Sequence, residues 1–267
     1  MRLILKYALM IVAGLAVIGM LVAAPLLLRA RKESDRQFEK YSRYTRETLE
    51  QHFRLSPRPV KAEFRTLHPW KFLKLFKISV QSFRSQKLAS LNNLDATMFF
   101  CMKMFTLMIR PDYTYNLPML SVDIVFIGGR RVFVIEVIDP ARIEDDVTGK
   151  YYPGLRARAA ELAHFEQKGH RDWYTDFIQD FSVHIKADRT SDDLLFDTYK
   201  TYLSAYAGMA REARPLSTEQ SARVKQGIET YVATLLEKGG PAVEVFEKML
   251  GTAGQHEYVR TVMFGVD

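Results

Sequence analysis

The 267-residue sequence contains a single cysteine, Cys101, so no disulfide can form within the chain. Cys101 lies in the apolar run 98–107, where a buried structural thiol is expected rather than a reactive one. The sequence has no CxxC pair, and its six histidines are scattered without the spacing of metal ligands. These absences exclude a disulfide scaffold and predict a protein without a metal site.

The motifs of the common nucleotide-binding and hydrolytic folds are also missing. There is no GxGxxG, no Walker A loop, no GxSxG and no HExxH, which leaves no argument for a nicotinamide, P-loop, hydrolase or metalloprotease fold. The formal charge is +7, but no helix-turn-helix, zinc-finger or RNA-binding signature accompanies it. The basic residues gather in the N-terminal third, which favours an anionic membrane surface or an acidic protein over nucleic acid. A solvated basic face without a partner is the alternative.

One long hydrophobic run stands near the N-terminus. Residues 7–28 include no charged side chain, and these 22 residues exceed the roughly 20 that a helix needs to span a bilayer. We therefore expect residues 1–32 to form a transmembrane anchor. A cleaved signal peptide ending near Ala23 and Ala24 is the alternative, but the apolar run continues past these alanines and exceeds a typical signal core.

The charges around this run predict its orientation. Only Arg2 and Lys6 precede it, whereas six basic residues follow within about fifteen positions: Arg29, Arg31, Lys32, Arg36, Lys40 and Arg43. Basic flanks stay on the cytoplasmic side of a membrane. We expect a single-pass protein with its N-terminus outside and its C-terminal domain in the cytoplasm.

The rest of the chain divides into a charged segment and one domain. Residues 33–59 are rich in charge and predict a linker helix, and residues 60–267 predict a single domain. Strands are expected at 105–110, 121–128, 131–138 and 180–187, with a hairpin turn at Gly128-Gly129. Helices are expected at 155–168, 191–211, 217–238 and 241–250. Strands first and helices later favour an α+β fold with an antiparallel sheet flanked by helices.

Two stretches of this domain allow more than one interpretation. Residues 67–83 mix aromatic side chains with lysines, so they could lie on a membrane surface or dock on the domain. Asp123 lies in the strand pattern SVDIVFIG (121–128), where burial disfavours the charged form of a carboxyl group. A buried carboxyl group requires either a partner, basic or backbone, or a proton. The second case would make Asp123 a candidate site residue.

The stretch FTLMIRPDYTYNLPMLSVDIVFIGGRRVFVIEVIDP (105–140) resembles the core of the ferredoxin-dependent bilin reductases. The matching positions are a proline and an acid after the first strand, a tyrosine and proline before the second, and an aspartate within it: Pro111, Asp112, Tyr115, Leu117, Pro118, Met119, Leu120, Asp123 and Pro140. Residues 173–187 and 245–264 are similar to later blocks of that family, in the same order. The resemblance implies a three-layer α/β/α sandwich with a central antiparallel sheet.

The resemblance also implies a function. Members of the family bind an open-chain tetrapyrrole and reduce it with single electrons from ferredoxin, without a tightly bound cofactor, so the protein must supply the protons. Asp123 matches the proton-donating aspartate of the family. The substrate-binding positions it implies are Thr106, Tyr115, Pro118, Met119 and Lys186.

Two positions and the predicted anchor depart from the family pattern. Thr106 stands where members carry histidine or asparagine, Gly240 lies in a GGP run that replaces Asn-Asp-Lys, and the familiar members are soluble. Lys186 matches a family arginine that can hold a propionate group, and a solvated lysine is the alternative. Threonine cannot act as an acid near neutral pH, and the second carboxyl group of the family is absent. The alternatives to a membrane-anchored reductase are therefore a non-catalytic tetrapyrrole-binding or assembly subunit of a membrane complex, and a scaffold without a ligand.

Overall fold

The fold is known from a computed structural model that describes residues 2–68, 76–98 and 102–266. The side chains of residues 1–23, 241 and 242 also lie outside the description. Within the described ranges, nine strands form one antiparallel sheet in the order β1-β3-β4-β5-β6-β7-β9-β8, with β2 paired to β3. The strands are β1 Ser56–Pro57, β2 Thr66–Leu67, β3 Phe76–Arg84, β4 Leu88–Met98, β5 Met102–Pro111, β6 Met119–Ile127, β7 Arg130–Ile138, β8 Glu166–Gln167 and β9 Val183–Asp188.

The central strands confirm the sequence prediction. The expected strands 105–110 and 131–138 lie within β5 and β7, and 121–128 ends one residue beyond β6. The expected strand 180–187 overlaps β9. Gly128 adopts φ +54° in the turn between β6 and β7, a conformation that glycine enters at little cost. The strands β3 and β4 were missed, because β4 carries Asn92, Asn93 and Asp95 in place of an apolar run. Residues 76–83 of the ambiguous aromatic stretch belong to β3, so this part docks on the domain, while 69–75 lie outside the described residues.

The helices expected after the central strands are present, although their bounds differ. The helices are α1 Arg2–His52, α2 Ala62–Arg65, α3 Asp146–Glu161, α4 Asp192–Glu212, α5 Thr218–Lys238 and α6 Pro241–Glu257, with the 3-10 helices η1 Asp172–Asp176 and η2 Arg189–Ser191 and the π-helix η3 Tyr258–Phe264. Ser217 and Gln220 cap α5 reciprocally, and Pro241 begins α6, both as the sequence predicts. The helix expected at 155–168 begins earlier and ends at Glu161.

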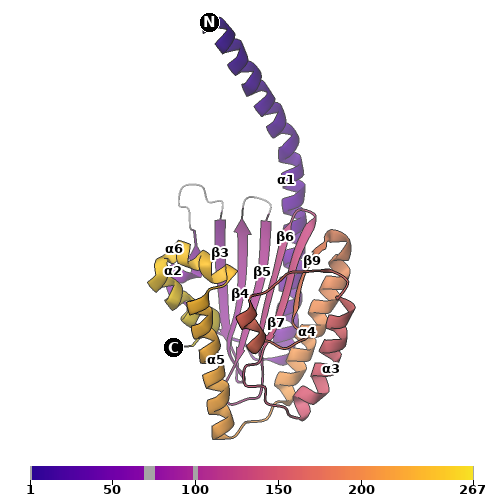
Figure 1. The fold of residues 1–267 in the computed structure, drawn as a ribbon, viewed down its shortest axis with the longest axis vertical. Helices are drawn as coiled ribbons and strands as arrows, with labels where there is room; N and C mark the ends of the chain where they lie inside the picture. Colours follow the sequence, from indigo (N-terminus) through magenta and orange to yellow (C-terminus); the bar gives the residue numbers. More distant parts are fainter. Residues whose placement is uncertain (1, 69–75, 99–101, 267) are drawn as a thin grey trace.

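The helices cover both faces of the sheet (Figure 1). Two hydrophobic clusters of buried side chains fill the spaces between the layers. Side chains alternate between the two faces along each strand. Phe105, Val122 and Phe133 face α1 and α4, whereas Met108, Met119 and Ile138 face α5, α6 and η3. The protein is therefore an α+β fold with an antiparallel sheet between two helical layers.

The predicted linker helix is part of the folded domain. Residues 33–52 belong to α1, and Tyr41 and Leu49 are 2% and 1% exposed in the cluster on the sheet. Arg131 of β7, itself 1% exposed, pairs with Glu33 at 3.0 Å and with Asp192 of α4 at 2.7 Å. The predicted boundary at residue 60 is thus wrong, because the few apolar residues of this charged segment all gather on the side that docks.

The predicted membrane anchor lies mostly outside the side chains that the structure describes. The run 7–28 belongs to α1, but most of it, residues 7–23, is outside the described side chains. Within the part that the structure describes, no helix is long and apolar enough to cross a membrane. The membrane anchor remains a prediction.

Candidate functional site: a cavity with paired acids on the sheet

Strand register brings Asp123 into a row of side chains on one face of the sheet. Thr106 of β5 pairs with Asp123 of β6, which pairs with Val134 of β7, which in turn pairs with His184 of β9. Residues paired across antiparallel strands point to the same face. This face is the one that α5, α6 and η3 cover.

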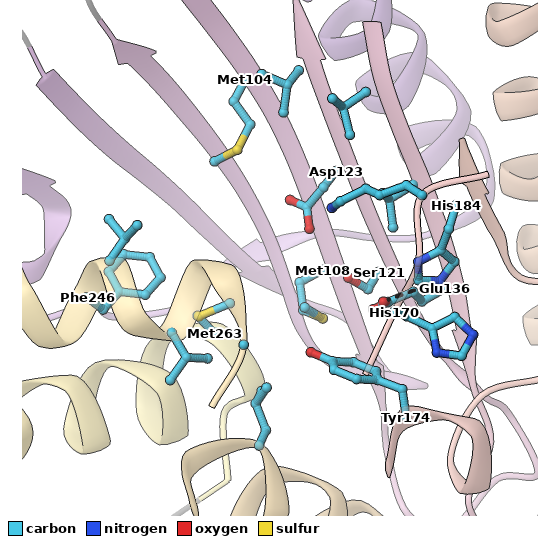
Figure 2. A pocket seen from close by; sticks show the side chains of 18 of the residues that line it. Met104, Met108, Ser121, Asp123, Glu136, His170, Tyr174, His184, Phe246 and Met263 are labelled. Atoms are coloured by element: carbon cyan, nitrogen blue, oxygen red, sulfur yellow. Dashed lines mark ion pairs between the residues drawn. The ribbon is translucent and has the colours of Figure 1, made fainter. Parts of the chain in front are cut away.

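A cavity of about 530 Å³ lies between this face and the C-terminal helices (Figure 2). Its walls are mostly apolar, and the polar groups gather on the sheet and on the loop 168–171. The apolar side chains include Phe76, Ile78, Met98, Met104, Met108, Val125, Val132, Val134, Val243, Phe246, Met263 and Phe264. The polar side chains are Ser121, Asp123, Glu136, Lys168, His170, Arg171, Tyr174, His184 and Tyr231. Such a lining, apolar with a few polar groups, is typical of small-molecule sites.

Side chains of the sheet hold the C-terminal wall of the cavity in place. Arg110 donates to the carbonyl oxygens of Phe264 at 2.5 Å and Gly265 at 2.7 Å, and Asn92 donates to that of Met263 at 2.8 Å. These bonds satisfy carbonyl groups at the end of the π-helix η3 that would otherwise lack partners. Met263 and Phe264 are thereby fixed as part of the cavity wall.

Asp123 is half-buried, and the surface that remains open faces the cavity. Burial among apolar side chains raises the pKa of its carboxyl group, because desolvation disfavours the charged form. A hydrogen bond from Thr106 Oγ1 to Asp123 Oδ1 at 2.5 Å and the positive charge of Lys168 oppose this shift, and burial prevails. Asp123 therefore holds a proton more readily than an ordinary aspartate.

Glu136 is a second carboxyl group in the same cavity. Ser121 pairs with Glu136 across β6 and β7, which makes Glu136 a diagonal neighbour of Asp123. Burial, the negative charge of Asp123 and an opposing contribution from Lys168 together raise the pKa of Glu136 to about 8. At pH 7 most Glu136 side chains are therefore protonated, neutral and able to donate a hydrogen bond.

His184 lies beside Glu136, with Nε2 3.5 Å from Oε1 (Figure 2). The two would form an ion pair only if both were charged. Burial, together with the nearby His170 and Lys168, lowers the pKa of His184 to about 4. The neutral forms of both groups are thus favoured at pH 7.

Asp123 is the one predicted site residue that lines the cavity. Thr106 supports it from behind through the hydrogen bond, and Met119 is buried in the same hydrophobic cluster without reaching the lining. Pro118 is buried outside the lining, and Tyr115 forms a bridge to Pro215. Lys186 is exposed, outside the lining, and pairs with Glu166 at 2.6 Å.

Glu136 and His184 were not predicted as site residues, although the sequence pattern around Glu136 indicates one. Glu136 interrupts the strand pattern RVFVIEVI (131–138) just as Asp123 interrupts its own strand. Burial in a strand disfavours the charged form of the Glu136 carboxyl group for the same reason as that of Asp123. Gly240, where the resemblance implies the family's second carboxyl group, also lines the cavity, and the second acid in this cavity is Glu136 on β7.

Within the described residues, no group of three or more His, Cys, Asp and Glu side chains is placed to hold a metal ion. The site is thus defined by its acids, its histidines and its apolar walls. The structure therefore defines a class of protein with an α+β fold, a cavity large enough for a small molecule, and two carboxyl groups that can hold protons.

The family is identified by a match to the model of the ferredoxin-dependent bilin reductases over residues 42–265. The chain belongs to that family. The match begins within α1, which agrees with the docking of this helix on the sheet.

Two relatives illustrate how far the chain has diverged. The phycoerythrobilin:ferredoxin oxidoreductase of Nostoc punctiforme is 23% identical over 176 residues, which cover 62% of this chain and 67% of that protein. The crystal structure of tomato phytochromobilin synthase in complex with biliverdin superposes with a TM-score of 0.73 at 16% identity. That superposition covers 85% of this chain and 83% of the tomato chain, and it confirms the fold.

The raised pKa of Glu136 predicts a pH-dependent stability. Between about pH 4.5 and 8 the folded protein keeps a proton on Glu136 that the unfolded chain releases, so this group's contribution to stability falls as pH rises. Glu136→Gln removes that fall. The free energy of unfolding of the variant relative to wild type should increase by on the order of 2–4 kcal/mol across this window, measured by urea unfolding. The exposed Glu237→Gln is the control, and a difference for Glu136→Gln that does not change with pH would contradict the assignment.

Proposed function

We propose that this protein reduces an open-chain tetrapyrrole, a bilin, with single electrons from ferredoxin or a similar acidic electron carrier. The observation that carries the proposal is the pair of carboxyl groups, Asp123 and Glu136, on the floor of one apolar cavity. Family membership supports the same reaction. No tightly bound cofactor is needed in this scheme, because the carrier supplies the electrons and the protein supplies the protons.

The cavity suits such a substrate in size and chemistry. Its volume of about 530 Å³ lies within the range of about 300–1,000 Å³ usual for small-molecule sites. Methionine and aromatic side chains such as Met104, Met263 and Phe246 can contact a flat conjugated system on both sides. The related tomato fold was solved with biliverdin, which supports a bilin as the ligand here.

The acids supply what single-electron reduction requires. Each double bond that is reduced takes up two electrons and two protons, and a carrier such as ferredoxin brings the electrons alone. A neutral carboxyl group can hydrogen-bond to a pyrrole nitrogen or carbonyl oxygen and then donate its proton, which typically contributes about 10²–10⁴-fold to a rate. Thr106 does not donate a proton itself, but its hydrogen bond orients Asp123 toward the cavity.

Lys168 is a better candidate than Lys186 for binding a carboxylate side chain of the substrate. Lys186 pairs with Glu166, whereas Lys168 lines the cavity and makes no ion pair within the part of the chain that the structure describes. A carboxylate group of the substrate would give the Lys168 ammonium an anionic partner. Arg171 lines the same cavity but already pairs with Glu244, so Lys168 is the better candidate.

Replacing Asp123 tests the proposed reaction. Asp123→Asn keeps the shape and removes the ionisable proton, so bilin reduction in an anaerobic reduced-ferredoxin assay should fall about 100-fold or more. Biliverdin binding, followed by its absorbance, should stay within about threefold of wild type. The control is Asp146→Asn, the same substitution at an exposed aspartate outside the cavity lining, and it should change neither.

Two results would contradict the proposal. If the wild-type protein binds biliverdin but does not reduce it, the alternative of a non-catalytic tetrapyrrole-binding or assembly subunit is correct. If neither wild type nor variant changes the biliverdin spectrum, a bilin is the wrong ligand class.

We further infer that residues 7–28 anchor this reductase in a membrane, with the catalytic domain on the cytoplasmic side. The support is the uncharged run itself and the basic residues that follow it. After cell lysis, the full chain should sediment with membranes and be released by detergent but not by high salt. A chain beginning at residue 33 should stay in the supernatant, and release of the full chain by salt alone would refute the anchor.

A further inference from the structure

Three side chains lead from the surface into the acidic end of the cavity. His170 is exposed on the loop 168–171, and its ring centroid lies 5.1 Å from that of His184. His184 is only 9% exposed, and its Nε2 lies 3.5 Å from Oε1 of Glu136. Figure 2 shows His170, His184 and Glu136 close together, with a dashed line between His184 and Glu136.

The buried histidine has an unused ring nitrogen. His184 Nε2 makes no hydrogen bond in the described part of the chain, although it points toward the Glu136 carboxyl group. Leaving a buried polar atom without a hydrogen bond costs free energy. A structural histidine would be expected to use both nitrogens, so the arrangement indicates another role.

When a ligand fills the cavity, its acids need a route for reprotonation, and His170 and His184 can supply one. A bilin bound against the sheet excludes water from Asp123 and Glu136, yet each reduced double bond consumes two protons. An acid that has given up its proton under the ligand must regain one from solvent by another route. A neutral imidazole can accept a proton at one nitrogen and release one from the other, which suits it to that route.

We propose that His170 and His184 form a proton path from solvent to Glu136, which recharges the acidic site while the substrate occupies the cavity. This inference rests on the proposed function. It assigns Glu136 as the second proton donor of the site in place of the carboxyl group that is missing at Gly240.

The steps balance in protons and electrons. The carrier delivers two electrons, one at a time, and the bilin takes up one proton from Asp123 and one from Glu136 for each double bond reduced. The Glu136 carboxylate then accepts a proton from His184, which accepts one from His170, which takes one from solvent. Asp123 regains its proton from solvent once the product has left the cavity. No other reactant is required.

The charges around His184 are compatible with a group that holds a proton only in passing. Glu136 on β7, Asp123 on β6, and Lys168 and His170 on the loop 168–171 all line the cavity beside His184. Burial and the two basic neighbours favour neutral His184, so a proton that arrives from His170 moves on to a Glu136 carboxylate.

Turnover of His184→Gln is the first test. Glutamine keeps the size and the hydrogen-bonding capacity but cannot carry a proton through its side chain. Steady-state bilin reduction should fall at least about tenfold, with biliverdin affinity within about threefold of wild type. His170→Gln changes an exposed position that does not threaten folding, and it should slow turnover in the same way. His164→Gln, an exposed histidine outside the cavity lining, is the matched control and should be unchanged.

Chemical rescue separates proton transfer from mere positioning. In His184→Ala, added imidazole should restore a measurable part of the lost rate, and it should not accelerate wild type or His164→Gln. Unchanged turnover in both His184→Gln and His170→Gln would overturn the path and leave the proposed function intact.

A measurement without turnover keeps the two claims distinguishable. In 15N-histidine NMR of the ligand-free protein, Glu136→Gln should shift the His184 ring nitrogens and leave those of His164 in place. If wild type reduces no bilin, the proposed function fails. The NMR result then still tests the contact between His184 and Glu136, on which the path depends. A His184 signal indifferent to Glu136→Gln would overturn the path.

Discussion

The burial of two carboxyl groups side by side on one face of the sheet is the constraint on which the site depends. Asp123 and Glu136 lie in an apolar cavity where a charge is costly, and each negative charge disfavours the other. Protons resolve this conflict, and for Glu136 they remain bound up to about pH 8. A cavity whose carboxyl groups hold protons is suited to reactions in which the electron donor supplies electrons but no protons.

The scaffold makes this arrangement rigid. The opposite face of the sheet packs against α1 and α4, and the buried Arg131 ties β7 to both helices through Glu33 and Asp192. On the cavity side, Arg110 and Asn92 hold the carbonyl groups of the C-terminal turn. The strand that bears Glu136 and the wall opposite it are therefore each fixed by polar contacts away from the cavity.

Much of the fold could be predicted from the sequence, since strong local signals coincide with the elements. The Gly128-Gly129 hairpin and the Ser217 cap are encoded within a few residues. The docking of α1 was not predictable, because its few buried side chains, such as Tyr41 and Leu49, are hidden among charges. Asp123 was recognisable as a polar residue in a core strand. Its position beside Glu136 and the proposed path through His184 depend on strand register, which only the folded sheet reveals.

The most direct test of this account is infrared difference spectroscopy of the ligand-free protein at pH 7. Wild type should show the carbonyl stretch of protonated carboxyl groups, and Glu136→Gln should remove the component that disappears from wild type as the pH is raised through about 8. Asp123→Asn should retain that stretch, and its loss should move to lower pH because the neighbouring negative charge is gone. A wild-type spectrum at pH 7 without any protonated carboxyl signal would contradict the central claim.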